Sequence, residues 1–306
     1  MKLNIVFLGS PDFAVAILKM LASKFIITGV VTQPDRPAGR GKILTPPPVK
    51  ALAEELGIPT MQPERLKNPD SFSQLQAWKP DLIVVAAFGQ ILRQNVLDLP
   101  KYGCINVHAS YLPRWRGAAP IQAAILNGDP FSGVSIMKMD AGIDTGAVLS
   151  QEKVTLAEDE TLSSLTQKLA DAGSKLLVDT LPPYLEGTLK PKDQENKNAT
   201  YAPMLKKEDG RLDFTQSSVA IDRKVRALND WPGTFTEVKS QILKIRKVKS
   251  IDSQHHKAGL RCIVEKYPAI GTPDGLIVLL EVQPTGKKWM SGADYLRGIQ
   301  NWISDD

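Results

Sequence analysis

The sequence predicts an α/β protein, with a mostly parallel sheet in the first part of the chain and a smaller β domain in the last third. Two patterns indicate this. In the first part, short uninterrupted apolar runs alternate with segments whose apolar residues have helical spacing. In the last third, short strand-like runs are separated by glycine, proline and polar turns. Alternating strands and helices imply parallel strands joined by right-handed crossovers, whereas several closely spaced short strands are typical of a small barrel.

The strands expected in the first part are mostly continuous apolar runs, which is typical of strands buried on both faces. They cover residues 3–8, 26–32, 81–87 and 104–107. Helical spacing predicts helices over residues 13–21 and 48–56. A longer helix is expected over 158–184, with Asp159 as its N-terminal cap and the Pro182-Pro183 pair as its break.

A polar stretch containing lysine, asparagine and proline, residues 189–206, is expected to be a linker. It would join a domain over residues 1–188 to a second domain over 207–306. The second domain is expected to contain a helix at each end, over 217–228 and 291–302. Its strands are predicted at residues 234–238, 242–248, 260–264 and 276–282.

Composition sets further limits. The 306 residues suffice for two domains, and 42% hydrophobic with 23% charged residues is typical of a soluble globular protein. The sequence contains no long uncharged apolar run, so no membrane span is expected. The apolar segment at the start is short and lacks a cleavage site, which indicates a strand rather than a signal peptide. Cys104 and Cys262 lack metal-ligand spacing, so we expect both to be reduced and buried in a cytoplasmic protein. A net charge of +5 is compatible with a nucleic-acid partner.

Two common nucleotide-binding motifs are absent from the sequence. After the first strand the chain reads Gly9-Ser10-Pro11-Asp12, without the Gly-x-Gly-x-x-Gly that lets a backbone approach a pyrophosphate. A Gly-Lys-Ser/Thr phosphate loop is also absent. The sequence therefore does not predict nicotinamide binding.

The strongest candidates for chemistry are Asn106, His108 and Asp144. Asn106 and His108 share one face of an otherwise apolar strand, and Asp144 lies in the glycine-flanked loop AGIDTG. An imidazole can exchange a proton near neutral pH, a carboxylate can orient it, and an amide can donate to an oxyanion. A hydrogen-bonded core is the alternative, but the carboxyl end of a parallel strand favours a cleft. With one His, one Asp and one Asn, no metal is expected.

Basic residues cluster in two places. The long connection over residues 33–48 is either a solvated, mobile loop or an arm that meets phosphates. The second cluster, residues 239–249, is either an exposed strand edge protected by lysines or part of a surface for a polyanion, to which Lys287-Lys288 adds. His255 and His256 lie in a polar turn and are expected to be solvated.

The central run INVHASYLPRWRGAAPIQAAILNGD, followed by GVSIMKMDAGIDTG, resembles the core of the 10-formyltetrahydrofolate-dependent formyltransferases. The segments FLGSPDFA, VTQPDRPAGRGKILTPPPVK, VVAAFGQILR, WPGTF and QPTGKKWMSG extend the resemblance over nearly the whole chain. The PDRPAGRGK loop and the C-terminal domain resemble the branch that acts on methionyl-tRNA rather than the smaller members that act on free nucleotides.

The resemblance implies a Rossmann-like formyltransferase fold with a smaller OB-like barrel, and the transfer of a formyl group from 10-formyltetrahydrofolate to initiator methionyl-tRNA. It implies catalysis by Asn106, His108 and Asp144, without a metal. The implied folate contacts are Phe88, Gly89, Gln90, Ile91, Leu92, Ser110, Tyr111, Leu112, Pro113, Asp140 and Gly142. The implied tRNA contacts are Arg36, Arg40, Lys42, Lys50, Lys244, Lys247, Lys249, Lys287 and Lys288.

One position departs from the family pattern, because Ala109-Ser110-Tyr111 stands where Gly-Ser-Leu is common. Two other functions stay open at this point. A formyltransferase for a small amine, such as a nucleotide or amino sugar, would need neither the basic loop nor the second domain. An RNA-binding module with a degenerate site would lack some of the three catalytic residues. A monomer is expected, since nothing in the sequence indicates a large apolar interface.

Overall fold

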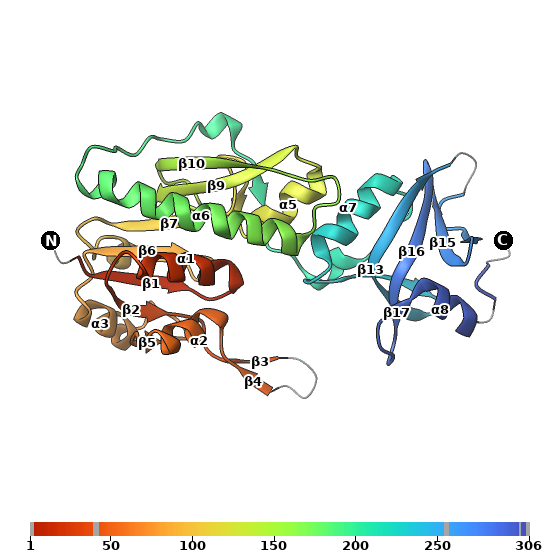
Figure 1. Cartoon of the computed structure of the whole chain (residues 1–306), viewed down its shortest axis with the longest axis horizontal. Coiled ribbons are helices and arrows are strands. Elements are labelled where there is room, and N and C mark those ends of the chain that lie inside the picture. The colour runs from red at the N-terminus through yellow and green to blue at the C-terminus, as the bar shows by residue number, and fades with distance from the viewer. Residues whose placement is uncertain (1–2, 39–42, 254–256, 300, 304–306) are drawn as a thin grey trace. The chain divides into compact units, whose positions relative to one another are not determined.

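The computed structural model describes residues 3–38, 43–253, 257–299 and 301–303. The chain divides into two compact units (Figure 1). The first comprises Met1–Pro120, Phe131–Thr155 and Thr166–Ala202, and the second Ile121–Pro130, Leu156–Leu165 and Pro203–Asp306. Residues 189–202, which were expected to belong to the linker, thus pack within the first unit. The domain bounds 1–188 and 207–306 stay a prediction.

The first unit is built on a seven-stranded sheet with the order β10-β9-β7-β6-β1-β2-β5. The five strands from β7 to β5 are parallel, and β9 and β10 continue the sheet in antiparallel pairing. The strands are β1 (Ile5–Gly9), β2 (Ile27–Val31), β5 (Thr60–Met61), β6 (Leu82–Ala86), β7 (Cys104–His108), β9 (Phe131–Lys138) and β10 (Val148–Thr155). Every residue of β1, β6 and β7 is buried, as their apolar sequences require.

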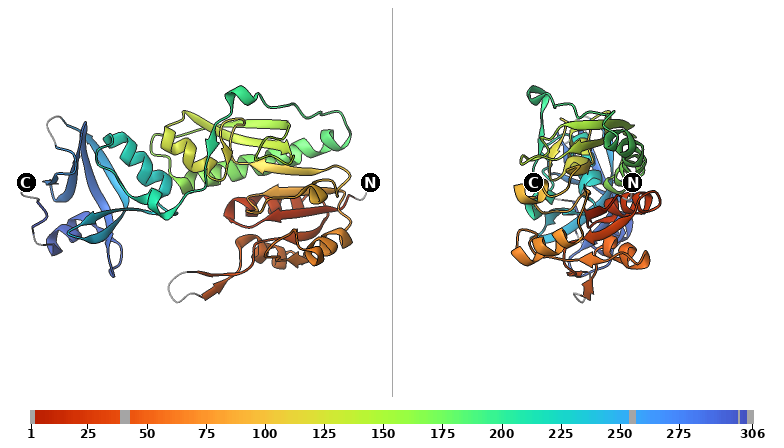
Figure 2. Two further views of the ribbon diagram at one scale, coloured as in Figure 1. Left: turned by 180° about the vertical axis from the view of Figure 1, so that it is seen from behind. Right: turned by 90° about the vertical axis from the view of Figure 1, so that its left-hand side faces the viewer.

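Helices cover both faces of this sheet. α1 and α6 lie over one face, in front of the sheet in Figure 1 and on the right in the end-on view of Figure 2. On the other face, Cys104 of β7 belongs to an apolar cluster with Leu75 of α3 and Val96 of α4. The helices up to residue 185 are α1 (Asp12–Ala22), α2 (Pro48–Glu55), α3 (Pro69–Ala77), α4 (Gln94–Leu97), α5 (Pro120–Asn127) and α6 (Leu162–Leu185). Because side chains alternate along a strand, Asn106 and His108 lie on the Cys104 face.

Short elements flank the sheet. They are β3 (Arg36–Ala38), β4 (Ile43–Thr45), β8 (Arg116–Gly117), β11 (Tyr201–Ala202) and the 3₁₀ turn at Asn196–Asn198. β3 and β4 form a hairpin within the segment that was expected to be a loop. β8 pairs in parallel with β11.

The second unit contains an antiparallel six-stranded sheet, in which β12-β13-β16-β15-β14 are neighbours and β17 pairs with β16. Its strands are β12 (Thr234–Val238), β13 (Gln241–Asp252), β14 (Arg261–Val264), β15 (Tyr267–Thr272), β16 (Gly275–Pro284) and β17 (Met290–Ser291). The 3₁₀ turn at Lys207–Gly210 precedes helix α7 (Ser218–Leu228), and α8 (Gly292–Gly298) follows the sheet. Ile221 and Val225 of α7 join the apolar core with Leu279 of β16. The predicted fold class is confirmed, with the smaller domain observed as this antiparallel sheet.

Helix α6 differs from its prediction at both ends. It begins at Leu162 rather than at residue 158, because Thr161 and not Asp159 caps it: the backbone N–H of Ser164 donates to Thr161 Oγ1 at 3.2 Å. The prolines do not break it before Leu185. Proline lacks an N–H but its φ is compatible with a helix, and the Pro182 carbonyl still accepts a hydrogen bond from Glu186 N at 3.0 Å.

Strand β13 bears on one interpretation of the basic cluster. Lys244 is paired on both sides, with Phe235 of β12 and Gln283 of β16, so it does not protect a sheet edge. Lys247 and Lys249 lie beyond the residues that pair with β12, and among the described strands they pair with β16 alone. The structure also contains β9, β10 and β15, which were not predicted, and the closing helix α8 is shorter than the predicted 291–302. In the described ranges, no helix combines the length and the hydropathy that crossing a membrane requires.

Candidate active site

Asn106 lies near the carboxyl end of β7 with 8% of its surface exposed. Its main chain belongs to the sheet, opposite Val85 of β6 and Met137 of β9. Within the part of the chain that the structure describes, no hydrogen bond engages its side-chain amide. A buried amide normally has hydrogen-bond partners, so this arrangement is unusual. It leaves the two N–H donors of the amide available for a substrate oxygen.

His108 is the last residue of β7 and is 6% exposed. Its Nε2 lies 2.8 Å from the main-chain oxygen of Trp115. Since a carbonyl oxygen only accepts, Nε2 carries a hydrogen and donates it. In the neutral ring the lone pair is therefore on Nδ1, and this atom faces Asp144 Oδ1 at 3.6 Å. The separation exceeds a direct hydrogen bond, but a carboxylate at this distance stabilises the ring when Nδ1 is protonated.

Asp144 lies in the loop between β9 and β10 with a backbone φ of +53°. Its Oδ2 accepts a hydrogen bond from Gly117 N at 2.8 Å. Earlier in the loop, Asp140 Oδ1 accepts from Gly142 N at 3.0 Å and from Thr145 Oγ1 at 2.7 Å. A Cβ at position 142 would lie 2.0 Å from Thr145 Oγ1, so a larger residue there would displace the Thr145 hydroxyl that donates to Asp140. Asp140 and Gly142, both predicted folate contacts, thus shape the loop that carries Asp144.

Gly117 supplies the one hydrogen bond that the described residues give to the Asp144 carboxylate. Its φ is +108°, and a Cβ there would lie 2.4 Å from the main-chain oxygen of Ala202. Only glycine fits the close pairing of β8 with β11. Trp115, two residues earlier, holds His108, so the segment 115–117 contacts both members of the pair.

The predicted folate segment Phe88–Leu92 follows β6 directly. Because β6 and β7 are parallel, their carboxyl ends lie at the same edge of the sheet, and this segment begins beside the strand that ends in His108. Gln33 Nε2 donates to Phe88 O at 3.0 Å, and Gly89 has a φ of +78°. Gln90 is held by Leu66 N at 2.8 Å and Pro63 O at 3.1 Å.

Exposure divides this segment into two groups. Phe88 and Leu92 are buried, whereas Gly89 is exposed and Ile91 is 83% exposed. The buried side chains anchor the segment, and the aliphatic side chain of Ile91 is left exposed. A contact between this segment and the folate stays a prediction.

The second predicted folate segment, Ser110–Pro113, is tied to the sheet by hydrogen bonds. Ser135 Oγ donates to Ser110 O at 2.7 Å and accepts from Leu112 N at 3.0 Å. Ser110 Oγ donates to Trp115 O at 2.8 Å. The ring of Tyr111, the departure from the family pattern, packs edge-on against Phe131 at 6.0 Å, and Lys153 Nζ lies 5.2 Å from its centroid.

The predicted tRNA contacts fall into both units. In the first, Arg36 is exposed on β3, but Lys50 Nζ is paired with Asp35 Oδ2 at 2.8 Å. Hydrogen bonds from Lys50 and Gln62 lower the pKa of the Asp35 carboxyl. Arg40 and Lys42 lie outside the described residues, as do His255 and His256.

In the second unit, the five predicted lysines are all exposed. Lys244 and Lys247 line a hollow of about 990 Å³ together with Arg246 and Trp289. Arg246 is paired with Glu281, and this hydrogen bond lowers the pKa of the Glu281 carboxyl. Lys249, Lys287 and Lys288 are not among the residues that line the hollow.

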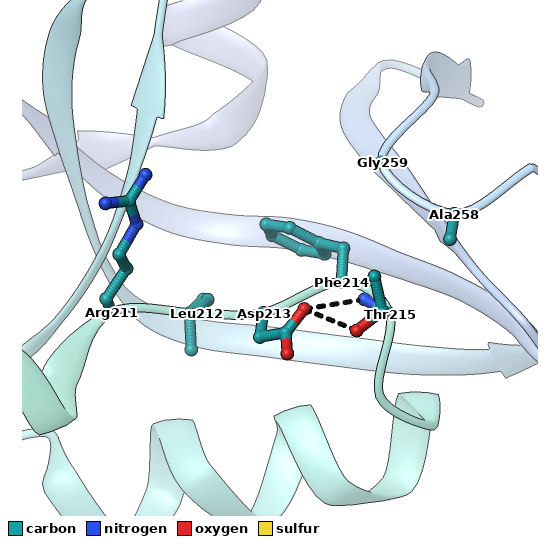
Figure 3. A pocket seen from close by; sticks show the side chains of 7 residues that line it. All are labelled: Arg211, Leu212, Asp213, Phe214, Thr215, Ala258 and Gly259. Carbon is teal, nitrogen blue, oxygen red and sulfur yellow. Dashed lines mark hydrogen bonds between the residues drawn. The ribbon is translucent and has the colours of Figure 1, made fainter.

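A smaller hollow of about 470 Å³ in the same unit lies along residues 211–215 and beside Ala258 and Gly259 (Figure 3). Asp213 Oδ1 accepts from Thr215 N at 3.0 Å and Thr215 Oγ1 at 2.7 Å, which lowers the pKa of the Asp213 carboxyl. The Arg211 side chain points away from this carboxylate (Figure 3). None of the predicted site residues lines this hollow.

Three residues that the sequence analysis did not single out complete the arrangement around Asp144: Arg116, Gly117 and Gln194. Arg116 and Gly117 stand inside the central motif, but nothing in a strand or helix pattern distinguishes them. Gln194 lies in the polar stretch that was predicted to be a linker, where one more polar side chain does not indicate a functional role. Among the described residues, no group of three His, Cys, Asp or Glu side chains is placed to hold a metal ion.

Comparisons with known proteins identify the family. The sequence matches two family models, "Formyl transferase" over residues 2–181 and "Formyl transferase, C-terminal domain" over residues 204–300. Two curated methionyl-tRNA formyltransferases are similar over 96% of this chain. That of Bacillus pumilus is 47% identical and covered to 94%, and that of Myxococcus xanthus is 44% identical and covered to 95%.

A solved structure shows the same fold. It is the N-formyltransferase of Helicobacter canadensis in complex with folinic acid and dTDP-3-aminofucose, which is 18% identical with a TM-score of 0.66. The superposition covers 93% of this chain and 99% of that one.

Proposed function

This chain belongs to the formyl transferase family, in the group of the methionyl-tRNA formyltransferases, and we propose that it formylates initiator methionyl-tRNA. The formyl donor is 10-formyltetrahydrofolate, the acceptor is the α-amine of the esterified methionine, and the product serves translation initiation in the cytoplasm. The observation that carries the proposal is the His108–Asp144 pair, with Nδ1 and Oδ1 3.6 Å apart. Beside it, at the end of β7, lies the Asn106 amide, to which the described residues make no hydrogen bond.

The first step joins the amine to the formyl carbon. As the C–N bond forms, the formyl oxygen gains negative charge, and the Asn106 amide donates a hydrogen bond to it. The attacking nitrogen loses one proton. His108 accepts it at Nδ1, because Nε2 is committed to Trp115 O.

The second step breaks the bond between the formyl carbon and N10. His108 returns the proton from Nδ1 to N10, so one proton leaves the amine and one reaches the departing nitrogen. Between the two steps Asp144 stabilises the imidazolium. None of these residues needs to form a covalent bond, and holding the two substrates together supplies much of the lowering of the barrier.

The nature of the acceptor rests on the relatives and on charge. The two relatives reported above, which match 96% of this chain, are methionyl-tRNA formyltransferases. The exposed lysines of the second unit suit a phosphate backbone. An enzyme for a small amine needs no such surface. We also propose that the enzyme acts as a monomer, which sedimentation of the purified chain would test.

The decisive experiment offers the purified enzyme 10-formyltetrahydrofolate with either methionyl-tRNA or glycinamide ribonucleotide, and measures formyl transfer to each. We expect kcat/KM for methionyl-tRNA to exceed that for the nucleotide by several orders of magnitude. Equal or preferred use of the nucleotide would replace the proposal with a small-amine formyltransferase. No transfer to either acceptor would favour a protein that only binds RNA.

A further inference from the structure

The Asp144 carboxylate is held mainly through its own backbone. The residue has a φ of +53°, a conformation that residues other than glycine keep only where surrounding contacts hold it. Its side chain receives one hydrogen bond, from Gly117 N. The position of Oδ1 opposite His108 therefore depends on how firmly the loop main chain is anchored.

Gln194 anchors that main chain. Its Nε2 donates to Asp144 O and to Gly146 O, both at 2.8 Å. One side-chain amide thus binds two carbonyls of the loop, on the catalytic residue itself and two residues further on. These contacts use both N–H donors of the amide.

Arg116 holds the other end of the same amide. Gln194 Oε1 accepts from Arg116 Nε at 3.0 Å and from Nη2 at 2.9 Å, so two donors of the planar guanidinium bind one oxygen. Nη2 also donates to Asn196 Oδ1 at 2.8 Å. The orientation of the Gln194 amide is therefore set, because the reversed amide would direct donors at the guanidinium.

Arg116 is an unusual residue to bury. It is 2% exposed, and within the described ranges the acceptors around its guanidinium are two amide oxygens and the Tyr201 hydroxyl, all of them uncharged. Burying a guanidinium without a carboxylate partner costs stability that an apolar side chain would not. The arrangement therefore calls for a reason other than stability.

We propose that Gln194, oriented by Arg116, is a positioning residue that keeps the Asp144 carboxylate opposite His108 during formyl transfer. This inference rests on the proposed function. Arg116 lies between Trp115, which holds His108 Nε2, and Gly117, which holds Asp144 Oδ2. The guanidinium and the two catalytic side chains are thereby linked through one short segment and one amide.

The first test replaces Gln194 with methionine, which has a similar volume and no hydrogen-bonding amide. We expect kcat for methionyl-tRNA to fall about 10- to 100-fold, with KM for both substrates within about threefold of wild type. Gln194→Glu retains the acceptor for Arg116, but an ionised carboxylate cannot donate to the loop carbonyls. It should therefore lose activity as Gln194→Met does, and full activity of Gln194→Glu would overturn the proposal.

The second test combines Gln194→Met with Asp144→Ala in single-turnover measurements. A residue that acts through the Asp144 carboxylate has nothing left to position once it is removed. We expect Gln194→Met to reduce the rate of Asp144→Ala by less than twofold. The same reduction as in wild type would show a general structural role and overturn the inference. Should Gln194→Met fail to fold, Gln194→Glu replaces it in the same double-mutant comparison with Asp144→Ala.

Gln167→Met is the matched control, because this glutamine is exposed on α6 and its side chain donates to Asp171 Oδ1. Its kcat should equal that of wild type. Failure of the wild-type enzyme to formylate methionyl-tRNA would count against the proposed function. Wild-type activity together with an unchanged Gln194→Met would count against this inference alone.

Discussion

The end of β7 and the outward side of β13 both carry polar residues with a proposed role, and they are built in opposite ways. Asn106 and His108 are almost fully buried, and their strand is paired on both sides. Lys244 and Lys247 are exposed on β13, which is paired on both sides at Lys244 and, among the described strands, with β16 alone at Lys247. Catalysis requires a few groups at fixed distances, whereas attraction to a polyanion requires charge in water. A single substitution should therefore have a large effect at the first place and a small, salt-dependent one at the second.

The largest effect is expected at His108. Replacement by alanine removes the group that moves the proton, and kcat should fall about 10²- to 10⁴-fold. The affinity for the folate co-substrate should change little, because the predicted folate contacts lie elsewhere. Single-turnover kinetics and equilibrium folate binding on the folded variant would measure both. Near-normal turnover would remove His108 from the mechanism.

Asn106→Ala should come next. It removes a donor to the developing oxyanion, and kcat should fall about 10²- to 10³-fold. Thermal unfolding measured in parallel separates this effect from a change in stability. Because the described residues make no hydrogen bond to this amide, we expect the melting temperature to stay close to that of wild type. A variant that is fully active but less stable would indicate that Asn106 is part of the core.

Cys104 tests the burial of the same strand. Burial, together with the charge of Asp98, raises the pKa of its thiol from 9.0 to about 12. As pH rises through this range, the unfolded chain releases the proton first. The unfolded state then binds fewer protons than the folded one, so the free energy of unfolding falls, by about 1.4 kcal/mol per pH unit.

Denaturant unfolding of wild type and Cys104→Ala between about pH 9 and about pH 10.5 would measure this contribution. The substitution also affects Tyr184, because Cys104 adds to the burial that raises the pKa of the Tyr184 hydroxyl. The difference between the two pH slopes therefore reports the thiol together with this coupling. We expect a shallower slope in the variant. Identical slopes would mean that the thiol is not buried as described.

The smallest effect is expected on the exposed face. Lys244→Ala combined with Lys247→Ala should raise KM for methionyl-tRNA several-fold and leave kcat unchanged. The slope of log KM against log salt should fall by about 0.7 to 0.9 for each phosphate that the two lysines neutralise in wild type. Lys24→Ala, at an exposed position after α1, is the control. An unchanged salt slope would exclude these two lysines from the tRNA-binding surface.

The distribution of apolar residues already predicted much of the fold. β1, β2, β6 and β7 were placed within a few residues, because a strand buried on both faces is apolar at nearly every position. β9 and β10 were missed. β10 contains charged and polar residues at exposed positions, and its pairing with β9 is decided by contacts that a local pattern does not contain.

The candidate site, like the fold, was partly predictable from the sequence. Strand alternation placed Asn106 and His108 on one face, and the polarity of a parallel sheet placed them at its edge. The central motif identified the family, which the comparisons confirm. These are local or topological properties, and a sequence carries them directly.

Tertiary structure alone decided three further features. The sequence could not place the Asp144 carboxylate 3.6 Å from His108 Nδ1, because the two residues lie 36 positions apart in the chain. It could not pair Lys50, a predicted phosphate contact, with Asp35. It gave Gln194 the character of a linker residue, although the amide joins Arg116 to the catalytic loop. Local patterns determine which residues a strand or loop contains, whereas hydrogen bonds between distant segments determine where the charges and donors meet.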